Sequence, residues 1–145
     1  MHSIKSFPNE EKYIISDHCF FTLQYSFAQS TENIIDKKLV GSWKGYEKDN
    51  QVVGMEKYWI QHRFEDGSFI ILFTAIADCE VMTTVEKGKW WVKDGLFYEL
   101  HLNSNKTDIY SYELLNDATQ VKFKAKTLSV DHENQAYEFI DTKVE

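Results

Sequence analysis

The chain has 145 residues, a length typical of one domain, and its 43% hydrophobic and 15% aromatic content is enough for one sizeable core. Its net charge of −7 argues against binding to nucleic acid or to anionic membranes, because both need clustered cations. The apolar stretches are too short to span a bilayer. Cys19 and Cys79 form neither a CxxC motif nor a Cys/His cluster, so the sequence predicts no metal site and no cofactor. A single disulfide between Cys19 and Cys79 stays open.

Residues 1–28 have two interpretations. The stretch from Tyr13 to Ala28 is fairly apolar and ends in small residues where a signal peptidase would need them, which is typical of an export signal. Glu10 and Glu11, however, occupy what would be its basic region. The segment is therefore either a degenerate export signal, which would make the mature protein secreted or periplasmic, or an N-terminal arm of a cytoplasmic protein. The folded domain is expected to span residues 29–145.

The sequence of residues 29–38 is typical of a short helical turn before the sheet. Ser30 or Thr31 would cap its N-terminus, and Lys37 and Lys38 suit the negative end of the helix dipole. The apolar side chains of this segment are expected to face the rest of the domain: Ile34, Ile35 and Leu39.

The rest of the chain divides into eight alternating segments, each closed by a turn signal. They are residues 39–48, 52–64, 68–76, 80–93, 96–102, 107–115, 120–126 and 135–144. Asp-Gly, the strongest short hairpin signal, occurs at 66–67 and 94–95, and it requires positive φ at both residues. Short connections make neighbours in sequence neighbours in the sheet. The pattern predicts an all-β fold, an eight-stranded antiparallel up-and-down barrel.

Three motifs resemble the lipocalin (calycin) superfamily. Gly41-Ser42-Trp43 is similar to its GxW feature, 64–69 resembles the hairpin that follows in small bacterial lipocalin-like domains, and 87–95 resembles their later Gly-x-Trp strand and turn. The resemblance covers roughly residues 35–145 and implies a ligand-sized barrel in which Trp43 is the structural plug of the narrow end. No basic pair matches the carboxylate clamp of fatty-acid-binding proteins, so a fatty acid is not the expected ligand.

Strand alternation predicts which side chains line the barrel. The expected cavity wall consists of the residues on the apolar side of their segments: Tyr58, Ile60, His62, Tyr98, Tyr110, Tyr112, Phe123 and Phe139. Lys57, Trp59, Gln61 and Arg63 are then expected to face solvent. Polar tips on an apolar wall orient a ligand in a binding cavity, whereas in a filled barrel the same groups bond one another or the backbone.

The leading hypothesis is a non-enzymatic, lipocalin-like binding protein that holds a small apolar or aromatic molecule in the barrel. One alternative is a protein-interaction module with a filled barrel, presenting Trp59 and either Trp90 or Trp91 to a partner. Another is a small enzyme with His62 as acid or base, although no catalytic motif supports it. Some calycin-like barrels bind haem through a histidine, but no second ligand is spaced to join His62.

Overall fold

The computed structural model describes residues 32–129 and 137–145. It confirms the predicted all-β fold: eight antiparallel strands follow one another in chain order and close into a barrel in which the last strand pairs with the first. The strands are β1 Gly41–Lys48, β2 Glu56–Arg63, β3 Ser68–Ala77, β4 Glu80–Lys93, β5 Leu96–His101, β6 Lys106–Leu115, β7 Gln120–Thr127 and β8 Glu138–Lys143. The predicted N-terminal segment 1–28 and the possible partner cysteine, Cys19, lie outside the described residues.

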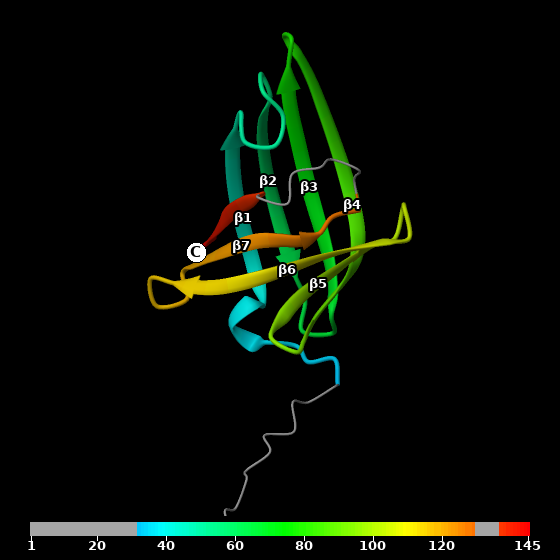
Figure 1. Ribbon diagram of the computed structural model, residues 1–145, viewed down its shortest axis with the longest axis vertical. Helices are drawn as coiled ribbons and strands as arrows, with labels where there is room; N and C mark the ends of the chain where they lie inside the picture. The colour runs from blue at the N-terminus through cyan, green and yellow to red at the C-terminus, as the bar shows by residue number, and fades with distance from the viewer. Residues whose placement is uncertain (1–31, 130–136) are drawn as a thin grey trace, which may run out of the picture.

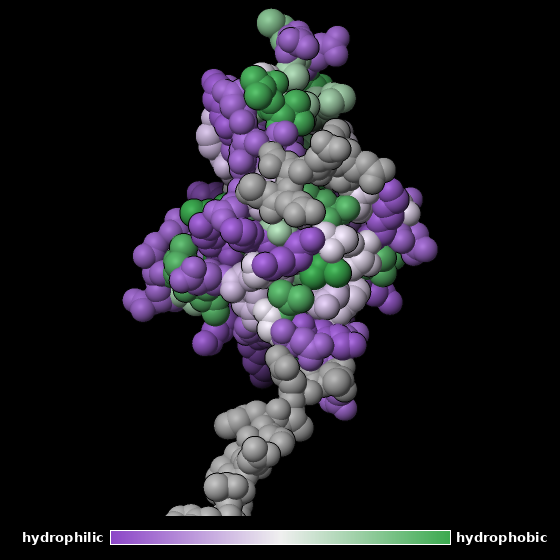
Figure 2. All heavy atoms as spheres, viewed as in Figure 1, coloured by the Kyte–Doolittle hydropathy of each residue, from purple (hydrophilic) through white to green (hydrophobic). Residues whose placement is uncertain are grey.

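The strands are arranged in two directions. β1 to β4 run along the long axis of the molecule, and β5 to β7 cross them (Figure 1). The hairpin of β3 and β4 projects beyond the other strands at the end opposite the short turn that precedes β1 (Figure 1). Figure 2 shows this side as largely hydrophilic, with hydrophobic groups over the projecting hairpin, where Val81 and Met82 are exposed.

The predicted helical segment is reduced to a single 3-10 turn, η1 Lys37–Leu39, in the described part of the chain. Its cap is Asp36, whose carboxylate accepts a hydrogen bond from the Lys38 amide at 3.0 Å. The expected caps, Ser30 and Thr31, lie outside the described residues. Leu39 is fully buried, and its carbonyl accepts a hydrogen bond from Trp43 Nε1 at 2.8 Å. The turn and Trp43 therefore close one end of the barrel. No helix in the described ranges is long and apolar enough to cross a membrane.

The hairpin turns differ from one another in backbone conformation. At Asp94-Gly95 both residues have positive φ, 51° and 74°, as the sequence predicts. At Asp66-Gly67 only the glycine does, and the Asp66 carboxylate instead accepts a hydrogen bond from the Ser68 amide at 2.8 Å. The Asp78-Cys79 turn has positive φ at both residues, 51° and 64°, without a glycine. The prediction of two equivalent Asp-Gly turns is thus wrong for the first of them.

The prediction of which side of β2 faces inward is wrong. Tyr58 and Ile60 lie on the outer surface with 43% and 53% of their area exposed, and His62 shares their side of the strand. The inward residues are the ones expected to face solvent: Lys57, Trp59, Gln61 and Arg63, all buried. Gly45, opposite on β1, makes room for the Trp59 ring, since a Cβ added there would lie 2.0 Å from it.

Aromatic side chains fill the closed half of the barrel. Trp43, Trp90 and the rings of Phe69, Phe97 and Phe123 form one cluster with Leu39 and Val121. Such close packing is typical of a filled protein core. This half of the barrel is therefore the hydrophobic core of the domain.

Candidate functional site

The other half of the barrel contains a cavity of about 520 Å³. Its wall is built by β2 to β6 and β8, so that distant segments of the chain meet there. The apolar and aromatic part of the wall consists of Trp59, Ile71, Phe73, Tyr110, Tyr137 and Phe139. The polar part consists of Gln61, Arg63, Thr84, Glu86, Glu99, His101, Ser104, Lys106, Asp108 and Ser129. The exposed members of this set, such as Thr84 and Lys106, mark the mouth.

His101 is at the centre of the polar part. Its Nδ1 lies 2.9 Å from a carboxylate oxygen of Glu86, and its Nε2 lies 3.2 Å from Asp108 and 3.8 Å from Glu99. The hydrogen bond to Asp108 and the neighbouring negative charges raise the pKa of His101 to about 9 against the opposing effect of burial. The imidazole is therefore a cation near neutral pH, and both of its nitrogens donate.

The two carboxyl groups on the Nε2 side of His101 differ in environment. Burial raises the pKa of Glu99, and the charge of Arg63 and a hydrogen bond from Gln61 at 2.9 Å only partly oppose it. Burial acts on Asp108 as well, but hydrogen bonds from His101 and from Ser129 outweigh it and lower the Asp108 pKa. Asp108 is thus held as an anion, while ionised Glu99 lacks comparable stabilisation.

A buried ion pair lies beside the cavity, with Arg63 in the cavity wall. Arg63 Nη2 lies 2.6 Å from Asp141, whose other oxygen accepts a hydrogen bond from Trp59 Nε1 at 2.7 Å. The guanidinium lies 5.1 Å from the ring centres of both Phe97 and Phe123, so its remaining nitrogens face aromatic surface. Within the described ranges, Arg63 Nε and Nη1 have no hydrogen-bond partner. Arg63 therefore contacts both the aromatic core and the cavity.

The structure places some of the predicted wall residues inside the barrel. Tyr110 and Phe139 line the cavity, and the Tyr110 hydroxyl donates to Asp108 at 3.1 Å. Phe123 is fully buried in the adjoining core, with its ring centre 5.0 Å from that of Phe139. Tyr112 packs against that core, and its hydroxyl donates to Asp36 beside the closed end at 3.0 Å.

The other predicted wall residues lie on the outer surface, and the expectation that they face the interior is wrong. Tyr98 stacks on Trp91 with ring centres 5.4 Å apart, on the opposite side of β5 from buried Phe97. His62 bonds to Ser42 Oγ at 2.8 Å. Tyr58 and Ile60 line a groove on the outer surface.

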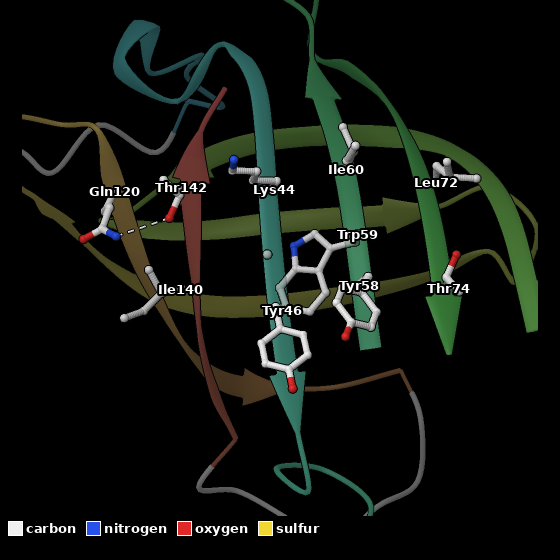
Figure 3. A pocket seen from close by; sticks show the side chains of 11 residues that line it. Lys44, Tyr46, Tyr58, Trp59, Ile60, Leu72, Thr74, Gln120, Ile140 and Thr142 are labelled. Atoms are coloured by element: carbon white, nitrogen blue, oxygen red, sulfur yellow. Dashed lines mark hydrogen bonds between the residues drawn. The ribbon is translucent and has the colours of Figure 1, made fainter. Parts of the chain in front are cut away.

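An open groove of about 690 Å³ crosses the outer face of β8, β1, β2 and β3 (Figure 3). Tyr46 and Tyr58 lie side by side on it with ring centres 4.8 Å apart, and Ile60, Leu72 and Ile140 continue its apolar surface (Figure 3). Trp59 borders this groove only because Gly45 lacks a side chain, since its ring occupies the space inside the barrel. The groove is a feature of the outer surface and has no buried polar groups.

Comparison of the sequence with models of known families and with curated proteins finds no match. The class that fold and site define is an eight-stranded closed antiparallel barrel with a partly aromatic, partly acidic internal cavity. The described residues contain no group of three or more His, Cys, Asp or Glu side chains spaced to hold a metal ion.

Sequence reasoning missed most of the polar wall: Gln61, Arg63, Glu86, Glu99, His101 and Asp108. One signal was available. In Phe97-Tyr-Glu99-Leu-His101 the ionisable residues alternate in phase with a phenylalanine, and a phenylalanine favours the inner face. The same reasoning would have placed Asp108 with Tyr110.

Proposed function

We propose that this chain is a non-enzymatic binding protein that holds a small aromatic molecule inside the barrel, in the manner that its lipocalin-like motifs imply. The internal cavity carries this proposal. A volume of about 520 Å³ lies within the range of small-molecule sites, and ligand pockets combine apolar walls with a few convergent polar groups. Trp59, Tyr110 and Phe139 offer aromatic surface, and Gln61 and Glu99 offer polar contacts.

The polar wall favours an aromatic ligand with a hydrogen-bonding group over a purely apolar one. A purely apolar occupant would separate Glu99 Oε1 from solvent without donating a hydrogen bond to it. That desolvation costs free energy. A ligand with one donor group avoids most of this cost.

The test is uptake of a neutral aromatic dye, 1-aminoanthracene, followed by its fluorescence. Thr84 and Thr83 are adjacent on β4 and face opposite ways, since Thr84 lines the cavity and Thr83 bonds to Thr74 on the outside. Thr84→Phe narrows the mouth and is expected to weaken uptake by about 10-fold or more, whereas Thr83→Phe, the matched control, leaves it unchanged. Native mass spectrometry of protein from its source should show a bound small molecule. If the wild-type chain takes up no dye and carries no molecule, the proposal is wrong.

A second candidate is a protein-interaction module, which the outer groove favours. Trp59, the residue first expected to contact a partner, is buried, so the exposed contact residues would be Tyr46, Tyr58, Ile60 and Leu72. In this case Ile60→Lys abolishes chemical cross-linking to the partner while Glu113→Lys, at an exposed position of β6 away from the groove, preserves it, and the cavity takes up no dye. The small-enzyme hypothesis loses its acid or base, because His62 lies outside the barrel.

A further inference from the structure

Carboxylates outnumber cations in the polar part of the cavity. Glu86, Glu99 and Asp108 surround one cation, His101. Arg63 does not offset this excess, since it is already paired with Asp141. Lys106 lies at the exposed mouth and donates to the Ser129 carbonyl at 3.0 Å. The interior of the cavity therefore has a net negative charge.

Glu99 has an oxygen available for a ligand. The side chain lines the cavity and is largely buried, with 12% of its area exposed. Its Oε2 accepts the hydrogen bond from Gln61. Its Oε1 accepts none within the described ranges, and the closest cationic nitrogen, His101 Nε2, is 3.8 Å away, beyond hydrogen-bond distance. A buried carboxylate with a free oxygen is stabilised most by a cation that also donates a hydrogen bond.

The aromatic wall adds a second preference for a cation. Trp59 and Tyr110 both lie edge-on to Phe139, with ring centres 5.5 Å apart in each pair. All three border the cavity. Aromatic rings attract ammonium groups through their negative faces and also pack against the ring of a ligand.

We propose that the ligand is an arylalkylamine, with its ammonium group at Glu99 Oε1 and its ring among Trp59, Tyr110 and Phe139. This inference rests on the proposed function and adds the charge of the ligand. The competing anionic ligand would need donors of Arg63 that it can reach. Nε and Nη1 have no partner within the described ranges, but both are buried, and the residue is only 1% exposed beside Asp141 and two aromatic rings.

Three indole probes of similar size test the charge preference by isothermal titration calorimetry at neutral pH: tryptamine, a cation; tryptophol, neutral; and indole-3-acetate, an anion. Tryptamine is expected to bind at least about 10-fold more tightly than tryptophol, and indole-3-acetate most weakly. Glu99→Gln removes the charge and keeps an acceptor for Gln61. It should weaken tryptamine binding by about 10-fold or more and change tryptophol binding by less than about 3-fold.

Glu113→Gln is the matched control, because it removes the same charge from the exposed outer side of β6 and should leave all three affinities unchanged. Glu99→Asp keeps the charge and is expected to recover part of the tryptamine affinity. Uptake of 1-aminoanthracene by Glu99→Gln shows that the barrel is intact. Equal affinities for the three probes, or tightest binding of indole-3-acetate, overturn the inference while dye uptake still supports the proposed function. If neither the indoles nor the dye bind, both are wrong.

Discussion

At the scale of single residues, the ion pair of Arg63 and Asp141 affects both the stability of the fold and the wall of the internal cavity. Both side chains are almost fully buried, and Asp141 also holds the Trp59 indole, which borders the cavity. Removing one member of a buried pair leaves the other as an uncompensated charge, whereas removing both is far less costly. The pair is therefore expected to be strongly coupled in energy.

Asp141→Asn is predicted to lower the free energy of unfolding by about 3–5 kcal/mol, because Arg63 loses its counter-ion in the core. The double variant Arg63→Met/Asp141→Asn should recover more than about 1 kcal/mol of that loss. Urea unfolding of the wild type, the two single variants and the double variant gives the coupling energy. Additive losses would show that the pair is not the stabilising unit.

The Tyr112 hydroxyl is a structural contact at the closed end. It donates to Asp36, the cap of η1, and burial together with this bond raises the pKa of Tyr112 to about 12. Tyr112→Phe is predicted to cost about 1 kcal/mol of stability, the value of one net hydrogen bond, and to leave dye uptake unchanged. Thermal unfolding and dye titration of the same sample measure both. A large loss of uptake with unchanged stability would place Tyr112 in the binding site.

At the scale of elements, the strand boundaries could be predicted because the signals that end strands are local. The ends of β4 agree with the sequence, whereas β2 begins at Glu56 rather than at residue 52 because the preceding residues form a turn. In that turn the Asp49 amide bonds to the Met55 carbonyl at 3.0 Å, and Gly54 bonds to the Asp49 carboxylate.

The inner face of β2 could not be predicted from β2 alone. Its polar residues are buried because their partners come from distant strands: Glu99 on β5 for Gln61 and Asp141 on β8 for Arg63. The pattern of polar and apolar residues along one strand places these side chains in solvent, because it carries no information on partners that lie 38 or 78 positions away in the sequence. Most of the candidate site is built from such pairs. For this reason the sequence indicated a cavity, but of the residues in its wall it correctly predicted only Tyr110 and Phe139.

The turn between β3 and β4 is under backbone strain that a glycine would relieve. Cys79 has a φ of 64°, a conformation that costs a non-glycine residue about 1 kcal/mol or more. Its side chain is exposed, so little packing is lost on its removal. Cys79→Gly is predicted to raise the free energy of unfolding by about 0.5–1 kcal/mol. Gly95→Ala makes the opposite change at a turn residue with a φ of 74°, and it should lower the free energy of unfolding. A destabilised Cys79→Gly would contradict this account.

At the scale of the whole molecule, closure of the barrel is what places charges inside. β1 pairs with β8 through Trp43–Lys143 and Lys44–Thr142, which joins the two ends of the sheet. Inner faces then meet across the barrel, so that Gln61 on β2 reaches Glu99 on β5 and Arg63 on β2 reaches Asp141 on β8. Inside the same barrel, ionisable residues of the neighbouring strands β4, β5 and β6 meet at His101. Folding is therefore coupled to the ionisation of this cluster.

The coupling predicts a loss of stability on the alkaline side of neutrality. Because the folded-state pKa of His101 is raised from its ordinary value of 6.5 to about 9, its contribution is complete below pH 6.5 and is lost as the pH rises through about 9. The raised pKa of Glu99 also makes the free energy of unfolding fall as the pH rises, and this fall begins at a lower pH than that of His101. We expect the free energy of unfolding to fall by up to about 3 kcal/mol between pH 6.5 and pH 9.

Urea unfolding at intervals across this range measures the loss, and two histidine variants identify its source. His101→Gln should flatten the profile because it removes the titrating group from the three carboxylates. His62→Gln, on the outer face beside Ser42, should keep the wild-type slope. Since the two substitutions are chemically identical and differ only in the side of the barrel, an unchanged slope in His101→Gln would mean that the cluster does not link pH to folding.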